Sequence, residues 1–151
     1  MDQIELMVEA GEAGTRTIGI RINGCSLVAM VREIEMPFAC AEGRPEIAGD
    51  YAGLPLYVAT PPSRHLYGDP ALTFYASGER VSVLECPCGL PRCWPLLVHI
   101  ESDEHTVTWH TFEQPHRTPG SRAAHWDLST LGPFTFDRAE YDHAIQSLLW
   151  N

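Results

Sequence analysis

Alternation of apolar and polar residues predicts two β-strands near the start of the chain. Between residues 4 and 9, every second side chain is apolar, and two of the residues between them are glutamates. The same period of two returns over residues 18–22, with isoleucine at every second position. This period is typical of a half-buried strand, because successive side chains of a strand point to opposite faces.

A two-residue turn at Asn23-Gly24 predicts that the second strand continues into a third. Asn-Gly favours a hairpin because both turn positions adopt a positive φ. Three apolar pairs would then share one face: Ile22–Cys25, Ile20–Leu27 and Ile18–Ala29. We therefore expect Cys25 to face the core. The third strand is expected to fade over residues 33–36 and to stop at Pro37.

Residues 37–70 predict a long loop that packs over the sheet. Proline and glycine recur throughout this segment, and no apolar period lasts for long. The segment nevertheless carries too many large apolar side chains for a free linker. One short strand is expected inside it, at residues 56–59.

The pattern after that loop predicts two more hairpins. Their strands are expected at residues 72–76, 80–85, 96–100 and 106–112. If residues 102–105 form the loop of the second hairpin, Glu101 pairs with Thr106. The same register gives the pairs His99–Thr108, Leu97–His110, Cys93–Gln114 and Pro91–His116.

The C-terminal part of the chain carries the clearest helical pattern. Asp137 is a suitable N-cap, and Glu140 follows three residues later as in a capping box. Phe136 and Tyr141 occupy the positions of a hydrophobic staple. An apolar stripe then continues at Ala144, Ile145, Leu148 and Leu149. Many strands followed by one helix predict a single α+β domain over residues 1–151, with a mostly antiparallel sheet.

Composition narrows the possible functions. The net charge of -10 argues against nucleic acid and anionic membranes as partners, because binding to phosphate needs a positive surface. All ten basic residues are arginine, which excludes Schiff-base chemistry on a lysine side chain. No apolar run approaches the ~18 residues of a membrane span, and residues 1–5 lack the basic start of a secretory signal. We expect a cytoplasmic protein.

The strongest chemical signal is a turn that carries three of the chain's five cysteines. Cys86, Cys88 and Cys93 fall within eight residues, and proline and glycine interrupt the run. Thiolates and imidazoles are the usual ligands of Zn²⁺ in tetrahedral structural sites. We therefore expect Zn²⁺ at this turn. Its role would be structural rather than catalytic, because four protein ligands leave no open position for water.

His116 is the predicted fourth ligand, because the hairpin register brings it beside the cysteine turn. His99 and His110 rank below it. Two other interpretations of the cysteines stay open: reduced, partly buried thiols around a proline-rich turn, or a redox or disulfide centre. A redox centre more often shows Cys-x-x-Cys near a βαβ unit, and this chain shows neither feature.

The cysteine turn is part of a longer pattern. Its parts are CPCG at residues 86–89, CWPL at 93–96, W..F.QPHR at 109–117 and LGPF.FD at 131–137. This pattern resembles a group of small uncharacterised bacterial proteins for which no activity is established. The resemblance implies a bacterial, cytoplasmic protein, and it provides no catalytic residue.

Two functions fit these observations. The first is a binding or accessory protein that takes a partner protein or a small ligand, with a structural metal at the Cys86–Cys93 turn. The second is a metal- or thiol-dependent enzyme whose chemistry lies near Cys86, Cys88, Cys93 and His116.

Overall fold

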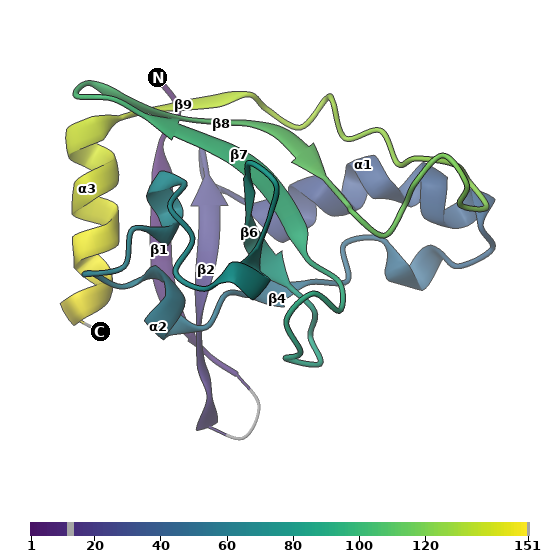
Figure 1. Ribbon diagram of the computed structural model, residues 1–151, viewed down its shortest axis with the longest axis horizontal. Helices are drawn as coiled ribbons and strands as arrows, with labels where there is room; N and C mark the ends of the chain where they lie inside the picture. The colour runs from purple at the N-terminus through teal and green to yellow at the C-terminus, as the bar shows by residue number, and fades with distance from the viewer. Residues whose placement is uncertain (12–13, 151) are drawn as a thin grey trace.

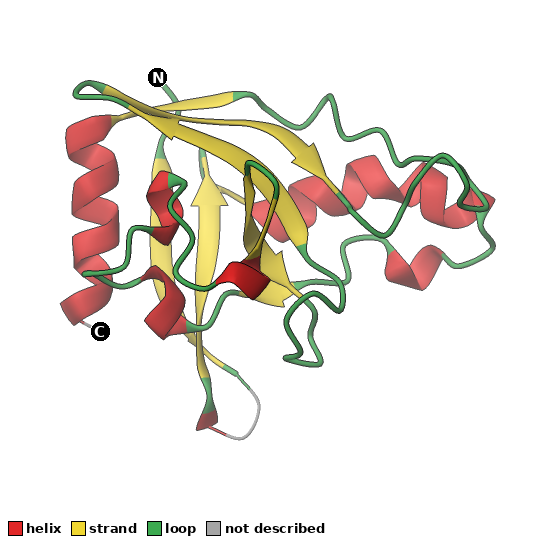
Figure 2. Ribbon diagram, in the orientation of Figure 1, coloured by secondary structure: helices red, strands yellow, loops and turns green. Residues whose placement is uncertain are grey.

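The chain folds into two antiparallel sheets, with its longer helices at opposite ends of the molecule (Figure 1, Figure 2). The computed structural model describes residues 1–11 and 14–150. The smaller sheet has the order β1-β2-β3; the larger has the order β4-β6-β7-β8-β9, with β5 paired to β6. This architecture confirms the predicted α+β class.

The elements have the following bounds. The strands are β1 Ile4–Ala10, β2 Arg16–Ile22, β3 Cys25–Ser26, β4 Ala52–Gly53, β5 Ala76–Ser77, β6 Arg80–Glu85, β7 Leu96–Ser102, β8 Thr106–Glu113 and β9 Phe134–Asp137. The α-helices are α1 Leu27–Ala41, α2 Leu56–Ala59 and α3 Arg138–Ser147. Single 3-10 turns lie at Pro45–Ile47, His65–Tyr67, Thr73–Tyr75 and Leu148–Trp150. Within the described part of the chain, no helix has the length and apolar character needed to cross a bilayer.

Strands β1 and β2 form where the period of two predicts them. Their register pairs Ile4 with Ile22, Leu6 with Ile20 and Val8 with Ile18. The Asn23-Gly24 turn is confirmed, with φ angles of 53° and 82°, and the predicted Ile22–Cys25 pair forms. The hairpin continues for only one further residue, so the other two predicted pairs do not form.

The predicted third strand is wrong, because the chain leaves the sheet after Ser26 and forms α1. The Ser26 hydroxyl oxygen accepts a hydrogen bond from the Ala29 N–H at 3.3 Å and caps the helix. Buried positions then recur every four residues, at Leu27, Val31, Glu35 and Ala39. Pro37 lies inside the helix and does not end it. Cys25 is exposed rather than facing the core, because its strand ends one residue later.

The loop predicted over residues 37–70 begins only after α1, so residues 42–70 form the packed segment, with short elements inside it. The predicted strand at residues 56–59 is wrong: this segment is α2, and the strand of the loop is β4. Gly53 lets the loop approach β2 closely, because a Cβ atom there would lie 1.9 Å from the carbonyl oxygen of Ile18. The Ile18 N–H also donates to the Leu54 carbonyl at 2.9 Å. The loop therefore joins the two sheets.

The hairpin predicted over residues 72–85 is confirmed only beside its turn. Ala76 pairs with Val81 and Ser77 with Arg80, whereas residues 73–75 form a 3-10 turn instead of a strand. Because β5 has only two residues, β4 can pair with the other end of β6, at Leu84 and Glu85.

The β7–β8 hairpin has a different register from the predicted one, because the centre of its turn lies one residue further along the chain, so that Ser102 pairs with Val107. The Asp103 N–H donates to the Thr106 carbonyl at 3.0 Å. The Asp103 side chain accepts from the N–H groups of His105 and Thr106 at 2.7 and 2.8 Å. These bonds centre the turn between Glu104 and His105, so Glu101 pairs with Thr108 and not with Thr106.

The new register changes which side chains meet across β7 and β8. His99 faces His110, and Leu97 faces Glu113, so the pairs predicted for both histidines are wrong. A β-bulge separates these two pairs. Thr111 lies in the bulge with a φ of 59°, a left-handed value that is uncommon for a β-branched residue.

The predicted start of helix α3 is confirmed. Asp137 accepts a hydrogen bond from the Glu140 N–H at 3.1 Å, and the rings of Phe136 and Tyr141 pack with centroids 5.5 Å apart. Tyr141 is fully buried, and its hydroxyl accepts a hydrogen bond from the Trp109 indole at 3.0 Å. The helix packs against β1 and so closes one side of the core.

Candidate metal centre

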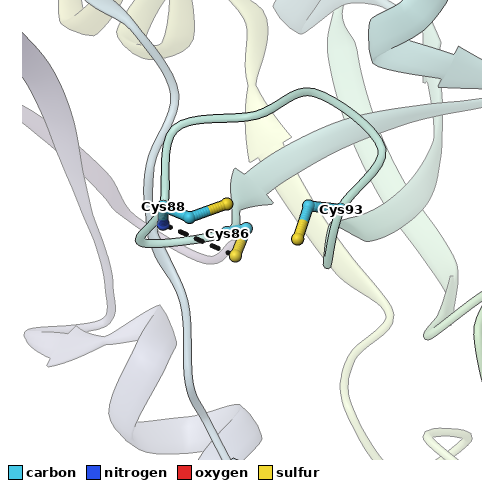
Figure 3. A group of neighbouring side chains, drawn as sticks. All are labelled: Cys86, Cys88 and Cys93. Carbon is cyan, nitrogen blue, oxygen red and sulfur yellow. Dashed lines mark hydrogen bonds between the residues drawn. The ribbon is translucent and has the colours of Figure 1, made fainter.

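The three predicted cysteines lie on one turn between β6 and β7 (Figure 3). Two backbone hydrogen bonds shape this turn: Gly89 N–H to the Cys86 carbonyl at 3.0 Å, and Cys93 N–H to the Leu90 carbonyl at 3.3 Å. Gly89 has a φ of 82°, a left-handed value that glycine adopts without steric penalty. The chain thereby reverses direction and brings the sulfur atoms together.

The sulfur atoms of Cys86, Cys88 and Cys93 lie within 4.8 Å of one another. Sulfur atoms bound to one tetrahedral Zn²⁺ stand about 3.8 Å apart, given a Zn–S distance of about 2.3 Å. Backbone N–H groups of Cys88 and Leu90 point at the sulfurs of Cys86 and Cys88, each at 3.5 Å. All five cysteines of the chain are free thiols. The cluster can therefore hold a metal ion.

The thiols of this turn differ in acidity. The Leu90 N–H, followed by the neighbouring thiols of Cys86 and Cys93, lowers the pKa of Cys88. Burial, together with the proximity of the other thiols, raises the pKa of Cys86 to about 12. Without a metal, Cys88 is therefore a better thiolate than Cys86, and a bound cation would replace the proton that Cys86 retains.

His116 contacts the turn at its backbone rather than at its sulfur atoms. Its Nε2 lies 2.7 Å from the Arg92 carbonyl oxygen, and its ring stacks on Trp94 with centroids 6.0 Å apart. The predicted ladder did not bring it there, because β8 ends at Glu113. The ligand atoms of His116 are not among those that lie within 4.8 Å of one another around the cysteines. His116 as the fourth ligand stays a prediction.

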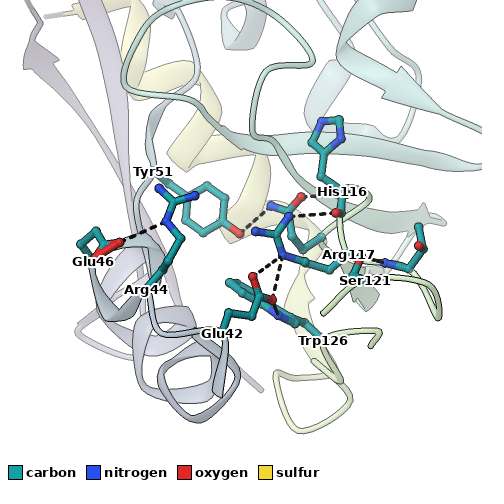
Figure 4. Close-up of polar contacts among 10 residues, drawn as sticks. Glu42, Arg44, Glu46, Tyr51, His116, Arg117, Ser121 and Trp126 are labelled. Carbon is teal, nitrogen blue, oxygen red and sulfur yellow. Dashed lines mark hydrogen bonds and ion pairs between the residues drawn. The ribbon is translucent and has the colours of Figure 1, made fainter. Parts of the chain in front are cut away.

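A buried ion pair anchors the C-terminal side of the turn (Figure 4). The Nε of Arg117 donates to both oxygens of Glu42 at 2.9 and 3.2 Å, and the Trp126 indole donates to the same carboxylate at 2.6 Å. The Arg117 guanidinium also lies 4.8 Å from the centre of the Trp94 ring and 5.2 Å from that of Trp126. These contacts hold the end of α1, at Glu42, and the segment that carries Arg117 and Trp126 against Trp94, which follows Cys93 directly.

A second buried hydrogen-bond chain runs beside this ion pair. Glu35 on α1 accepts from the Gly49 N–H at 2.8 Å and from the Tyr51 hydroxyl at 2.6 Å. The Gln114 amide donates to the Tyr51 oxygen and to the Pro95 carbonyl, each at 3.0 Å. Burial raises the pKa of Glu35 to about 7, although the bonds from Tyr51 and Gly49 oppose the rise.

A pocket of about 520 Å³ lies next to the cysteine turn. Its walls come from residues 74–78 on one side and from Arg92, Pro95, Pro115 and His116 on the other. The Arg92 guanidinium donates to the Thr73 carbonyl at 3.1 Å and so ties the two walls together. Because Arg92 lies between Cys88 and Cys93, the conformation of the turn determines one wall of the pocket.

Two buried polar side chains of β6 lack a hydrogen-bond partner among the residues that the structure describes. The hydroxyl of Ser82, which lines the pocket, and both carboxylate oxygens of Glu85 are buried without a partner. Burial raises the pKa of Glu85 to about 7. The nearby Ser82 hydroxyl and Arg92 N–H oppose this rise but lie outside hydrogen-bonding geometry.

Comparisons with known proteins found no matching protein-family model, and no curated protein or solved structure with significant similarity. The side chains around the turn therefore have to be interpreted from their own geometry. Sequence reasoning identified the cysteines, but it missed Glu42 and Glu35. The partners of these residues lie far along the chain, and no short-range pattern links them.

We predict that Arg117→Ala destabilises the protein by about 3–5 kcal/mol, because it leaves the carboxylate of Glu42 buried without its cation. Arg44→Ala is the matched control. Arg44 also pairs with a glutamate, at 3.2 Å, but both side chains are about 60% exposed, so its loss should cost less than about 1 kcal/mol. Urea unfolding of both variants measures the difference. Equal effects would contradict a buried ion pair.

We also predict that Glu85→Gln stabilises the protein at pH 8 and not at pH 5. Because the pKa of Glu85 is raised to about 7 in the folded state, the protonated carboxyl favours folding below pH ~4.5. That contribution disappears as the pH rises through 7. Glutamine avoids the buried charge, so the variant should gain about 1–2 kcal/mol at pH 8.

The control for this pH dependence is Glu79→Gln, since Glu79 is exposed on the β5–β6 turn. Denaturant titrations at pH 5 and pH 8 give the free energy of unfolding of each variant. A gain of equal size at both pH values would show that Glu85 is not the titrating group.

Proposed function

We propose that this protein is a binding module in which Zn²⁺, held by Cys86, Cys88 and Cys93, stabilises the wall of a ligand pocket. The observation that carries this proposal is the approach of the three sulfur atoms to within 4.8 Å on a turn that also supplies Arg92 to the pocket. Thiolate ligands favour zinc over magnesium or calcium. The five free cysteines fit the reducing compartment expected for a cytoplasmic bacterial protein.

His116 is the proposed fourth ligand, and a contact at Arg92 already holds it near the turn. To bind the metal, its Nε2 would exchange the Arg92 carbonyl for the ion. If His116 instead keeps this contact, it acts by orienting the turn, and water completes the coordination. The first arrangement closes the site and supports a structural role, whereas the second leaves the metal open to chemistry.

Metal content and Co²⁺ spectra of the cysteine variants test the zinc site. Wild-type protein should bind Co²⁺ with an intense near-ultraviolet sulfur-to-metal absorption, and Cys88→Ser and Cys93→Ser should lose most of it. Cys25→Ser and Cys40→Ser are matched controls, because both thiols are exposed and lie outside the cluster. Spectra that are identical in all four variants would refute the site.

The same titration distinguishes the two roles of His116. Loss of an orienting contact typically costs about 10–100-fold in metal affinity, whereas loss of a ligand costs more. His116→Ala therefore measures whether the ring binds the metal or only supports Arg92.

The pocket favours a small anionic molecule with an apolar body as the ligand. Arg92 provides a cation and His116 a hydrogen-bonding imidazole, whereas Phe74, Pro95 and Leu97 provide apolar surface. The chain as a whole has a charge of -10, so its surface repels anions except where cationic side chains gather.

We predict that the aromatic sulfonate 8-anilinonaphthalene-1-sulfonate binds in this pocket, with a gain in its fluorescence. Arg92→Ala should weaken its binding about 10–150-fold, because a charge-assisted hydrogen bond contributes about 1.5–3 kcal/mol. Arg122→Ala is the control, since Arg122 is exposed and does not line the pocket. Equal affinities in both variants would contradict binding at Arg92.

A thiol-dependent enzyme is the alternative function. It is favoured by the exposure of Cys88 and by the lowered pKa of its thiol, since thiolates are nucleophiles at neutral pH. Iodoacetamide should then modify Cys88 faster than Cys25, and Zn²⁺ should not protect it. Full protection by one equivalent of Zn²⁺ would instead support the binding module.

A further inference from the structure

A second group of metal-ligating side chains lies on β7 and β8. His99 and Glu101 are two residues apart on β7 and share one face, and His110 lies directly opposite His99 on β8. Their ligand atoms all lie within 4.8 Å of one another. The side chains of His99, Glu101 and His110 are 25%, 63% and 33% exposed, respectively, so an ion can reach them from solvent.

The carboxylate of Glu101 lies between the two imidazoles. One of its oxygens is 3.6 Å from His99 Nε2, and the other is 3.3 Å from His110 Nε2. Ligand atoms bound to one ion at about 2.1 Å stand about 3–3.4 Å apart. These two separations lie close to that range, and the ligand atoms of the two histidines lie within 4.8 Å of each other, so a single ion fits among the three groups after small side-chain rotations.

A further contact orients His110 for this role. Its Nδ1 lies 2.7 Å from the Thr111 hydroxyl oxygen, which leaves Nε2 directed at Glu101. Metal-bound histidines usually engage their second ring nitrogen in this way, because the contact fixes the tautomer and the ring orientation. Thr111 thus occupies the place of a supporting residue.

The β-bulge creates the pairing of the two histidines. An unbroken ladder from the Leu97–Glu113 pair would place Thr111 opposite His99. The extra residue in β8 brings His110 there instead, and Thr111 takes the left-handed φ of 59°. Strained backbone of this kind is concentrated at functional sites, and bulges often redirect a side chain there.

The surroundings permit a cation. Arg80 contacts the residue next to His110, because its guanidinium donates to the Thr111 carbonyl at 3.0 Å. The same guanidinium pairs with Glu113 at 3.5 Å. Its charge is therefore partly compensated. Two imidazoles and one carboxylate form a donor set that suits divalent first-row transition metals and leaves coordination positions open to water.

We propose that His99, Glu101 and His110 form a second metal site, which binds a divalent first-row transition-metal ion such as Zn²⁺ or Ni²⁺. The proposal is independent of the zinc site at the cysteines, because the two clusters share no residue. Three protein ligands on one face of a rigid hairpin would hold the ion while exchangeable water occupies the remaining positions.

Calorimetric titration with Ni²⁺ tests this site in the full-length protein, preloaded with one equivalent of Zn²⁺. Wild-type protein should bind one equivalent of Ni²⁺, and His99→Ala or His110→Ala should weaken binding ~100-fold or more. Thr111→Val, which keeps the branched shape, should weaken it about 10–100-fold. His143→Ala is the control, because His143 is exposed on α3, outside the cluster.

Several outcomes would overturn the proposal. They are unchanged Ni²⁺ affinity in both alanine variants, an equal loss in His143→Ala, or Ni²⁺ binding seen only with sulfur-to-metal absorption. Circular dichroism verifies that each variant is folded, and Glu101→Gln gives a conservative third variant, which should also weaken binding. If the cysteines bind no metal, the same titration without added Zn²⁺ reports on the histidine site alone.

Discussion

The buried pair between Arg117 and Glu42 is the interaction on which the arrangement of the remaining parts depends. Glu42 follows the last turn of α1, and Arg117 lies 75 residues later in the segment after β8. Two ion-pair partners removed from water are stable only when further groups satisfy them. Here the Trp126 indole donates to the carboxylate, and the Trp94 and Trp126 rings flank the guanidinium. Helix α1, the segment after β8 and the cysteine turn are therefore held together as one unit.

This anchor explains how an exposed turn can have a defined shape. On one side the turn continues from β6, whose Glu85 still pairs with Ala52. On the other side it ends at Trp94, which packs against Arg117, Trp126 and His116. With both ends held, few conformations remain for the segment between them. A metal ion bound there would meet sulfur atoms that are already close together, so less conformational entropy would be lost on binding.

The sequence predicted the parts of this fold that depend on local chemistry. Strand alternation in β1 and β2, the Asn23-Gly24 turn and the Asp137 cap were all visible within a few residues. Helix α1 was missed because a hairpin signal preceded it, while the Ser26 cap and the four-residue spacing of buried side chains decided the outcome. The register of β7 and β8 differed because the turn at Asp103–Thr106, which the Asp103 backbone and side chain stabilise, is centred one residue later than predicted. The partner of Glu42 could not be found locally, because burial and long-range packing select it.

Strand β7 links the features to which a function can be assigned. The cysteine turn leads into its first residues, Leu97 lines the pocket, and His99 and Glu101 lie on the same outer face further along. Its other face is buried in the core, so the strand is rigid. Sites on rigid elements hold their ligands more precisely than sites on free loops. Positive-φ backbone at Gly89, Arg92 and Thr111 lies in the segments beside this strand, and hydrogen bonds to the carbonyls of Arg92 and Thr111 stabilise the unusual conformations there. Arg92 lines the pocket and Thr111 follows His110, so the left-handed backbone at these two positions lies where it can direct side chains of the candidate sites.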